Sequence, residues 1–243
     1  MAETRTRGRR ERLRAETTAE IKDVALRLMA LGGPDAITLR AIAREMGMTA
    51  NAIYGYFATR DDLVTALIDD VYTGLADAVD AAWAATAADD PAGRIRAWAH
   101  AFRNWALANP AGFRLIYGDP VPGYQAPEGG AAPDAAQRVC TGLTALAAAA
   151  WPRASEASEA SEASEASEDF QWSDFDAGLL SKIRPAFPDL PPAAVALALR
   201  IWGHLHGLLC LEIYGHLRTQ MLNPDKLFRE ELAQLVRSLG LAA

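Results

Sequence analysis

The chain has few of the residues that build metal sites, disulfides or catalytic centres. Its 243 residues include two cysteines, Cys140 and Cys210, and four histidines. The cysteines have no paired spacing and the histidines no zinc-type spacing with cysteine, so we expect a reducing compartment, no metal site and no cofactor. A catalytic group of His204, His206 and Glu212 is unfavourable, because helical positions two apart point in different directions. The sequence therefore predicts a protein that is not an enzyme.

Long apolar runs and strand patterns are also missing. The longest apolar run, around residues 201–211, contains His204 and His206 and is shorter than the ~20 residues that cross a bilayer. The amino-terminal arginines are not followed by the apolar segment of a signal peptide. No alternating apolar pattern of a β-strand occurs. These absences predict an all-α, cytoplasmic protein without a membrane partner.

Negative charge dominates the whole chain but not its amino-terminal end. The formal net charge of -7 argues at first against a nucleic-acid partner. Residues 1–60, however, hold 11 Lys and Arg against 7 Asp and Glu, whereas residues 61–243 hold 13 against 24. Six arginines fall within the first 14 residues without apolar periodicity. We expect residues 1–15 to form a flexible basic arm, which either lies along DNA or serves as a solubilising tail.

Residues 38–60 have the spacing of two short helices joined by a turn. Four apolar residues recur at i, i+3, i+4 and i+7, on one face of the first helix. Gly47 suits a turn with positive φ, and Thr49 is expected to cap a second helix in which Ile53 faces the core. The spacing predicts a helix-turn-helix unit, whose second helix enters the major groove of DNA, but it also suits a generic helical hairpin. The four apolar residues are Leu39, Ile42, Ala43 and Met46.

Hydrogen-bond donors cluster around the same two helices. Thr38 and Thr59 occupy positions expected for helix N-caps, where hydroxyl and backbone N–H groups suit a phosphate. Tyr54 and Tyr56 add phenolic donors at the end of the second helix, and Arg60 adds a cation at the start of the next. This set of donors favours contact with a DNA backbone.

The window resembles the amino-terminal domain of the TetR family of bacterial transcriptional regulators. The family's pattern is matched by Thr38-Leu39-Arg40, by Ala43 to Gly47, and by the passage from Tyr54 to Leu63, YGYFATRDDL. The resemblance is dense over residues 17–70. It implies a three-helix DNA-binding domain at residues 16–62 and a larger helical ligand-binding and dimerisation domain at residues 63–243.

The resemblance also implies roles for individual residues. Arg40 and Asn51 would reach base edges, a chemistry that suits guanine and adenine respectively. Ala50 would touch thymine methyl groups, although Ala50 and Gly55 stand where the family often has larger side chains. The implied phosphate contacts are Thr38, Thr49, Tyr54, Tyr56 and Arg60.

Signals for the start of further helices occur on both sides of residues 38–60. Thr17 with Glu20 predicts a capping box that begins the first helix, and Thr59 with Asp62 predicts one for the fourth. Residues 154–168 are five Ala-Ser-Glu triplets, whose period of three does not match 3.6. We expect residues 151–172 to form a mobile, low-complexity linker, in part helical at most.

A long helix is expected after Pro191-Pro192, through about Thr219, and a last one from Pro224. The long helix is apolar nearly all round, so a second surface must cover part of it, and a twofold partner is the simplest cover. The resemblance to the TetR family implies a homodimer interface formed by the last two helices. Its passage from Trp202 to Gly207 resembles the Trp-x-x-x-His-Gly (WHG) signature of one carboxy-terminal domain type attached to TetR-family heads.

The resemblance to the TetR family also implies a ligand cavity enclosed by the earlier helices of the second domain, which aromatic residues at helical spacing could line with one histidine as a polar contact. Such a stripe is also typical of an ordinary core. The candidate lining residues are Trp98, Phe102, Trp105, Phe113, Tyr117, Trp202 and His206.

These expectations combine into a regulator of transcription. We expect a dimeric repressor on a palindromic operator of double-stranded DNA, which a small hydrophobic effector releases. The alternatives are an activator or a nucleoid-associated protein without such a ligand. A small helical enzyme is the weakest hypothesis.

Overall fold

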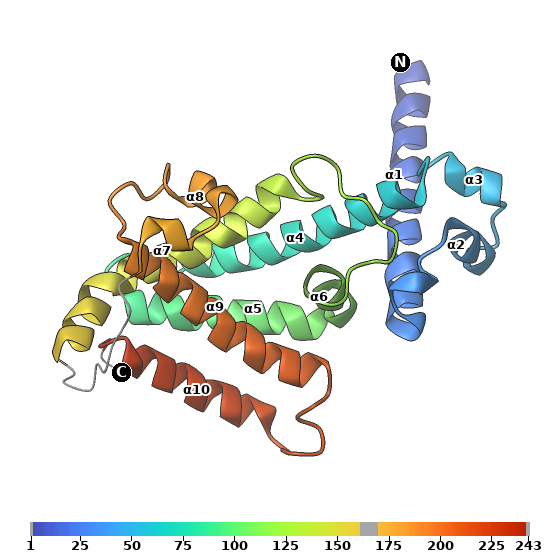
Figure 1. Ribbon diagram of the computed structural model, residues 1–243. Coiled ribbons are helices and arrows are strands. Elements are labelled where there is room, and N and C mark those ends of the chain that lie inside the picture. Colours follow the sequence, from blue (N-terminus) through green and yellow to red (C-terminus); the bar gives the residue numbers. More distant parts are fainter. Residues whose placement is uncertain (1, 161–169, 242–243) are drawn as a thin grey trace. The chain divides into compact units, whose positions relative to one another are not determined.

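The computed structural model describes residues 2–160 and 170–241, and all regular structure in these ranges is helical (Figure 1). The predicted all-α fold is confirmed. Two short 3-10 helices, η1 (Pro34–Ala36) and η2 (Trp172–Asp174), accompany the α-helices. The α-helices are α1 (Ala2–Gly32), α2 (Leu39–Glu45), α3 (Ala50–Tyr54), α4 (Arg60–Ala84), α5 (Pro91–Ala108), α6 (Pro110–Tyr117), α7 (Pro133–Ala160), α8 (Ala177–Ile183), α9 (Pro192–Ile213) and α10 (Pro224–Ser238).

The chain forms two compact units. Unit 1 comprises Met1–Tyr72 and Asn109–Pro133, and unit 2 comprises Thr73–Ala108 and Asp134–Ala243. Helix α4 therefore begins in unit 1 and ends in unit 2. Helix α6 and the loop after it belong to unit 1, although they follow α5 of unit 2 in the sequence.

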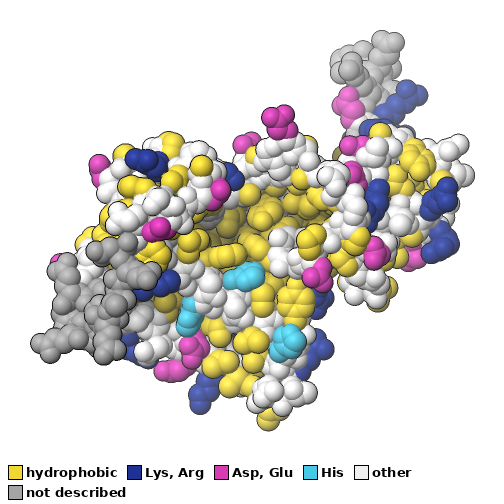
Figure 2. Space-filling model, viewed as in Figure 1, with side chains coloured by type: hydrophobic (Ala, Val, Ile, Leu, Met, Phe, Trp, Pro, Cys, Tyr) yellow, Lys and Arg dark blue, Asp and Glu magenta, His cyan; other side chains and the backbone are white. Residues whose placement is uncertain are grey.

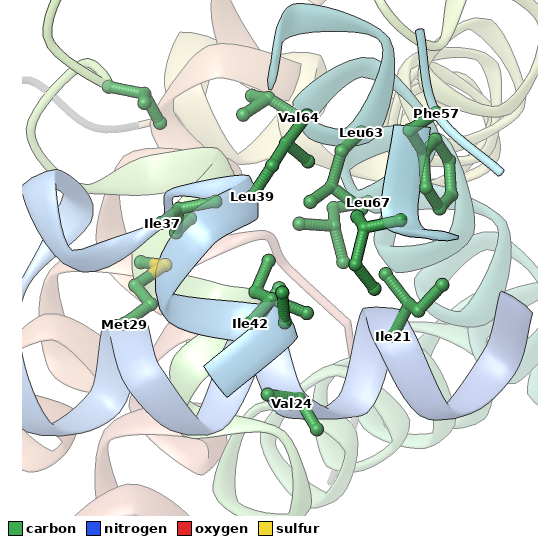
Figure 3. Packing of buried hydrophobic residues seen from close by; sticks show 14 of the residues in the cluster. Ile21, Val24, Met29, Ile37, Leu39, Ile42, Phe57, Leu63, Val64 and Leu67 are labelled. Carbon is green, nitrogen blue, oxygen red and sulfur yellow. The ribbon is translucent and has the colours of Figure 1, made fainter. Parts of the chain in front are cut away.

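Unit 1 is built on an apolar core to which α1, α2, α3, α4 and the α6 region contribute (Figure 3). The spacing of these residues places them on the inward faces of their helices. Two of the core residues come from far along the chain, and they explain why α6 and its loop pack with the amino-terminal helices. The core includes Ile21, Val24, Ile42, Ile53, Leu63, Leu67, Leu115 and Val121, none more than 7% exposed.

Helix α1 begins earlier than the sequence suggested. The Thr17 hydroxyl donates to the Leu13 carbonyl at 2.9 Å, so Thr17 lies inside the helix and does not cap it. The predicted capping box is wrong, and in residues 2–15 a helix replaces the expected flexible arm. Arginine, glutamate and alanine are good helix formers, and extending an existing helix avoids the cost of a new nucleus.

Helix α4 begins with the reciprocal cap that the sequence predicted. The Thr59 N–H donates to the Asp62 carboxylate at 2.9 Å, and the Asp62 N–H donates to the Thr59 hydroxyl oxygen at 3.0 Å. Two backbone donors that a helix start would leave unpaired are thereby satisfied.

The Ala-Ser-Glu repeat is partly helical. Helix α7 continues to Ala160 and so includes the first two triplets. The rest of the repeat, residues 161–169, lies outside the described residues, and the segment expected as a mobile linker ends in η2.

Unit 2 is held together by α9 and a buried arginine. The Arg103 guanidinium of α5 binds both carboxylate oxygens of Glu212 at 2.9 Å and donates to Asp225 at 2.8 Å. Hydrogen bonding to Glu212 raises the pKa of Arg103, and hydrogen bonding to Arg103 lowers the pKa of Asp225.

Helix α9 alone among the described helices is long and apolar enough to span a membrane, with a mean hydropathy of 1.5. Its residues Ile201, Leu205 and Leu209, however, are fully buried within unit 2.

Candidate nucleic-acid interface

The two short helices of unit 1 are each closed by a threonine cap. The Thr38 hydroxyl accepts from the Ala41 N–H at 3.1 Å, and the Thr49 hydroxyl accepts from the Ala52 N–H at 3.2 Å. Gly47 has φ 66°, the left-handed conformation that its place in the turn requires. The predicted caps and turn are therefore confirmed, and they set the angle at which α3 leaves α2.

Apolar packing decides which side of α2 and α3 faces outward. Ile42 and Ile53 are fully buried, so the opposite faces turn away from the core of unit 1. Arg40, Asn51 and Tyr54 are exposed there, and none of them bonds to another side chain or carbonyl in the described part of the chain. Two donors and a cation are thus free to meet a partner outside the chain.

Several of the predicted contact residues meet in one concavity of about 410 Å³. It lies where the starts of α2 and α4 approach the end of α3. Its lining contains two arginines and no carboxylate, so it suits an anion. Thr49, Ala50, Asn51 and Tyr56 lie outside this concavity. The lining residues are Thr38, Leu39, Arg40, Tyr54, Ala58, Thr59 and Arg60.

Arg60 has a structural role that the sequence did not indicate. Its guanidinium donates to the carbonyls of Ile37 at 2.6 Å, Pro122 at 2.9 Å and Pro34 at 3.3 Å. Three of its five N–H groups are therefore engaged within unit 1. Arg60 therefore links η1 and the loop after α6 to the start of α4, and it also lines the concavity.

Arg14 of α1 contacts the end of α3. Its guanidinium donates to the Gly55 carbonyl at 2.7 Å and lies over the Tyr56 ring, 5.0 Å from the ring centroid. Sequence reasoning placed Arg14 in the arm and missed this contact, because nothing local joins residues 41 positions apart. Arg14 holds the carboxyl end of α3, so it positions the helix that carries Asn51.

The loop between α6 and α7 packs on the start of α4. The hydroxyls of Tyr124 and Thr65 are 2.9 Å apart, and the Gln125 N–H donates to the Asp61 carboxylate at 3.2 Å. With the Arg60 contact to Pro122, these bonds fix the loop within unit 1. No sequence signal reports such pairings, since the partners lie about 60 residues apart.

The residues predicted to line a ligand pocket do not come together as a set. A cavity of about 360 Å³ lies within unit 2, and Trp98 is the one predicted residue in its lining. Phe102 is a buried core residue next to Trp98, with ring centroids 5.3 Å apart. Phe113 and Tyr117 belong to unit 1, where burial raises the pKa of Tyr117.

The remaining predicted pocket residues lie on α5 and α9. Trp105 is half-buried on α5, and the rings of Trp202 and His206 are 5.0 Å apart on α9. Burial lowers the pKa of His206. None of the three lines the cavity of unit 2. Within the described ranges no group of three His, Cys, Asp or Glu is placed to hold a metal ion.

Helices α9 and α10 expose apolar side chains on the face seen in Figure 2, with histidines among them. Leu199, Leu211 and Tyr214 are each more than 40% exposed. Gly203 and Gly207 lie between Leu199 and Leu211 at intervals of four residues, and an added Cβ at either glycine would meet nothing within 4 Å. Leu199, Gly203, Gly207 and Leu211 therefore form an exposed stripe of apolar and small residues on α9.

Comparison with known proteins gives matches over most of the chain. The family described as "Bacterial regulatory proteins, tetR family" matches residues 21–67, and the one described as "Tetracyclin repressor-like, C-terminal domain" matches residues 95–235. The HTH-type transcriptional regulators Rv1816 of Mycobacterium tuberculosis and Mb1846 of Mycobacterium bovis are each 34% identical, over 99% of this chain and 99% of their own.

Solved structures give the same result. The regulatory protein SCO4313 has a TM-score of 0.69 and 34% identity, over 93% of this chain and 98% of its own. A tetR-family regulatory protein from Rhodococcus RHA1 has a TM-score of 0.61 over 93% of this chain and 98% of its own, and at 19% identity it is evidence for the fold alone.

Proposed function

We propose that this chain, which belongs to the TetR family of bacterial transcriptional regulators, is a homodimeric repressor that a small hydrophobic effector releases from an inverted-repeat operator. Family membership makes it a DNA-binding regulator and not an enzyme. Repression, the dimer and the effector are our inference.

The observation that carries the DNA-reading part is the free outer face of α2 and α3. Arg40 and Asn51 are exposed and unpaired within the described residues, while the caps at Thr38 and Thr49 and the core beneath hold both helices rigidly. Arginine and asparagine are the side chains that read guanine and adenine bidentately in the major groove. We assign base contacts to these two residues, with apolar contact from Ala50.

The concavity, whose lining contains no carboxylate, supports a phosphate site next to the proposed base contacts. Thr38, Tyr54 and Thr59 supply hydroxyl groups around the two arginines. Phosphate contacts position a protein on DNA without reading its sequence. We therefore assign backbone contacts to Thr38, Thr49, Tyr54 and Tyr56, and to Arg60 through the N–H groups that its carbonyl partners leave free.

The exposed stripe on α9 supports the dimer. A face with Leu199, Gly203, Gly207 and Leu211 in line allows a second helix to approach closely. Twofold pairing buries the same stripe on both chains and accounts for its exposure in a single one. In such a dimer the two α3 helices would enter the major groove about one DNA turn apart, ~34–36 Å.

Effector release requires a ligand that binds the free state more tightly than the DNA-bound state. Helix α4 supports this coupling, because one unbroken helix carries both Arg60 of the concavity and Trp83 of the cavity wall. A ligand that displaced the end of α4 would alter the distance between the α3 helices of the two chains in the dimer. The complex with DNA would then be weaker.

Mobility-shift titrations with the duplex upstream of the chain's own gene and with a scrambled duplex test this proposal. Arg40→Ala is expected to narrow the difference in affinity between the two duplexes, since one good base contact provides about 1–3 kcal/mol of discrimination, while Asn51 and Ala50 keep the remaining preference. Tyr54→Phe is expected to weaken binding to both duplexes alike. Arg153→Ala, which removes the same charge from an exposed site in unit 2, is the matched control and should change neither. An Arg40→Ala protein with wild-type preference for its upstream duplex would refute the base contact.

A further inference from the structure

The cavity of unit 2 has the composition of a built ligand site. It lies between the end of α4, the middle of α5 and the first half of α7, and its volume of about 360 Å³ is within the range of small-molecule pockets. Two tryptophans, Trp83 and Trp98, give it apolar walls. All of its lining residues belong to unit 2, so the site is complete within one unit.

One wall of the cavity contains an unsatisfied donor. Trp98 is 1% exposed, and its indole Nε1 is buried without a hydrogen-bond partner in the described part of the chain. The indole N–H can only donate, and a buried donor without an acceptor is unfavourable. A ligand that brings an acceptor to this N–H removes that penalty, so it gains affinity over one that does not.

Gly142 borders this N–H and places no side chain against it. A Cβ built at Gly142 would lie 3.6 Å from Trp98 Nε1, at ordinary van der Waals distance. Both residues line the cavity, and glycine is otherwise unfavourable in the interior of α7. An acceptor atom that reaches over the backbone at position 142 therefore approaches the indole N–H.

The hydroxyl of Thr141, next to Gly142 in the sequence, is a second hydrogen-bond donor in the lining of the cavity. The Thr141 hydroxyl oxygen accepts from Gln137 Nε2 at 3.0 Å, and the same amide nitrogen donates to the Lys182 carbonyl at 3.0 Å. These bonds hold the Gln137 amide and occupy one lone pair of the Thr141 oxygen. The hydroxyl proton has no acceptor among the described residues, so it is available to a ligand.

The two charged side chains in the lining of the cavity, Asp80 and Arg138, are already paired with each other. Arg138 donates to Asp80 at 2.7 and 2.9 Å and to Asp77 at 2.7 Å. The Arg94 guanidinium lies 4.0 Å from the centre of the Trp83 ring and covers one face of that ring. An anionic ligand would compete with two carboxylates for Arg138, and a cationic ligand would compete with Arg138 for the carboxylates. A neutral ligand avoids both costs.

From these observations we infer that the cavity binds a flat, neutral, mainly apolar molecule that carries a hydrogen-bond acceptor, held by the Trp98 indole N–H and the Thr141 hydroxyl. The inference rests on the proposed function, in which such a molecule is the effector. It names the chemical class of that effector and the residues that select it.

Three naphthalenes of one shape test the inference. 2-Acetylnaphthalene is flat, neutral and carries a carbonyl acceptor, 2-ethylnaphthalene lacks the acceptor, and 2-naphthoate is an anion. Equilibrium dialysis read by naphthalene absorbance measures their binding to the full chain without relying on tryptophan emission. The wild-type protein is expected to bind the ketone about tenfold more tightly than either relative. Equal affinities for the ketone and the hydrocarbon would overturn the inference.

Two variants locate the acceptor contact. Trp98→Phe removes the N–H, and Gly142→Ala covers it with a methyl group while favouring the helix. Each is expected to reduce the affinity for the ketone to that for the hydrocarbon. Gly8→Ala, the same change at a position of α1 with open space around the added methyl group, is the matched control and should leave ketone binding unaltered. Unchanged ketone binding in a folded Gly142→Ala protein would place the ligand elsewhere.

Parallel mobility shifts separate this inference from the proposed function. Selective ketone binding without any loss of the DNA complex would support the site and refute effector release. Release of DNA by the ketone in Gly142→Ala as readily as in the wild type would support effector release and refute this site.

Discussion

The two units use their arginines in different ways. In unit 2, Arg103 and Arg138 each bind two carboxylates, so the charges of these two arginines are neutralised within the unit. In unit 1, Arg60 donates to backbone carbonyls, and Arg40 is exposed without a partner in the described residues. Unit 1 therefore keeps cationic charge for an external anion, although the chain as a whole is acidic.

The units also differ in composition in a way that allows each to be followed separately. All six tryptophans and all four histidines of the chain lie in unit 2. Tryptophan emission therefore reports the unfolding of unit 2, while far-ultraviolet circular dichroism reports both units. The following predictions use this difference.

The largest effect is expected from Arg103→Ala. The side chains of Arg103 and Glu212 are 8% and 15% exposed, so the substitution leaves a nearly buried carboxylate without its partner. Loss of one partner of a buried pair costs about 3–5 kcal/mol. Urea unfolding followed by tryptophan emission should show this loss. Arg138→Ala is the control, because its side chain is 41% exposed and such pairs contribute about 0–1 kcal/mol. Equal losses in the two variants would contradict the contrast between them.

Arg60→Ala is expected to destabilise unit 1 by about 2 kcal/mol, since several hydrogen bonds from a charged donor are lost from a partly buried site. The circular dichroism transition should move to lower urea while the tryptophan transition stays in place. The affinity for every DNA duplex should fall, whatever its base sequence, because a smaller fraction of the protein has a folded unit 1. Arg44→Ala, an exposed change on α2, should alter stability by less than about 0.5 kcal/mol. A shift of the tryptophan transition in Arg60→Ala would show that the effect is not confined to unit 1.

The same substitution should have opposite signs in the two units. Gly47→Ala places a side chain at φ 66° and is expected to cost about 1–2 kcal/mol. Gly207→Ala lies inside α9 with open space around the added methyl group, so it should stabilise the helix by about 0.5–1 kcal/mol. Because the methyl group interrupts the exposed stripe, the Gly207→Ala protein should also self-associate more weakly in sedimentation equilibrium. A variant that is more stable and dimerises as the wild type would exclude the stripe from the interface.

The smallest expected effect is a response of unit 2 to mild acid. Burial lowers the pKa of His100 and of His206 in the folded chain. Below the ordinary histidine pKa of about 6.5 the unfolded chain binds more protons than the folded one, so stability present above that pH falls as the pH is lowered. The tryptophan transition should weaken between pH 7 and pH 5.5, and His100→Gln with His206→Gln should flatten this dependence. Unit 1 contains no histidine and should respond less.

Local features of the fold were predictable from the sequence. The caps at Thr38, Thr49 and Thr59 and the turn at Gly47 depend on residues within a few positions of one another, and the structure confirms them. Helix extent was harder to predict. Thr17 is the right residue type to begin α1, but the helix also includes the residues before it, because most of them are arginine, glutamate and alanine, good helix formers that outweigh Gly8.

The candidate site was predicted in part for the same reason. Thr38, Arg40, Tyr54 and Arg60 come together because α2, α3 and the start of α4 are consecutive. The support from Arg14 and from the loop at Tyr124 was missed, because both contacts join residues far apart in the chain. The pocket prediction grouped aromatic residues by their type, and the structure distributes them between a core, a cavity wall and a surface of α9.

Residue type and near-neighbour spacing were sufficient to establish the all-helical fold, the caps of α2, α3 and α4, the helix pair α2 and α3, and the uneven charge of the two ends. These properties arise from hydrogen bonds and side-chain contacts that reach one or two helical turns. Tertiary packing alone decided that Arg60 donates to backbone carbonyls while Arg40 has no partner within the described residues. It also decided that Trp98 and Gly142 line the same cavity. Such outcomes depend on which distant segments bury their apolar faces together, and the order of residues along the chain does not state this.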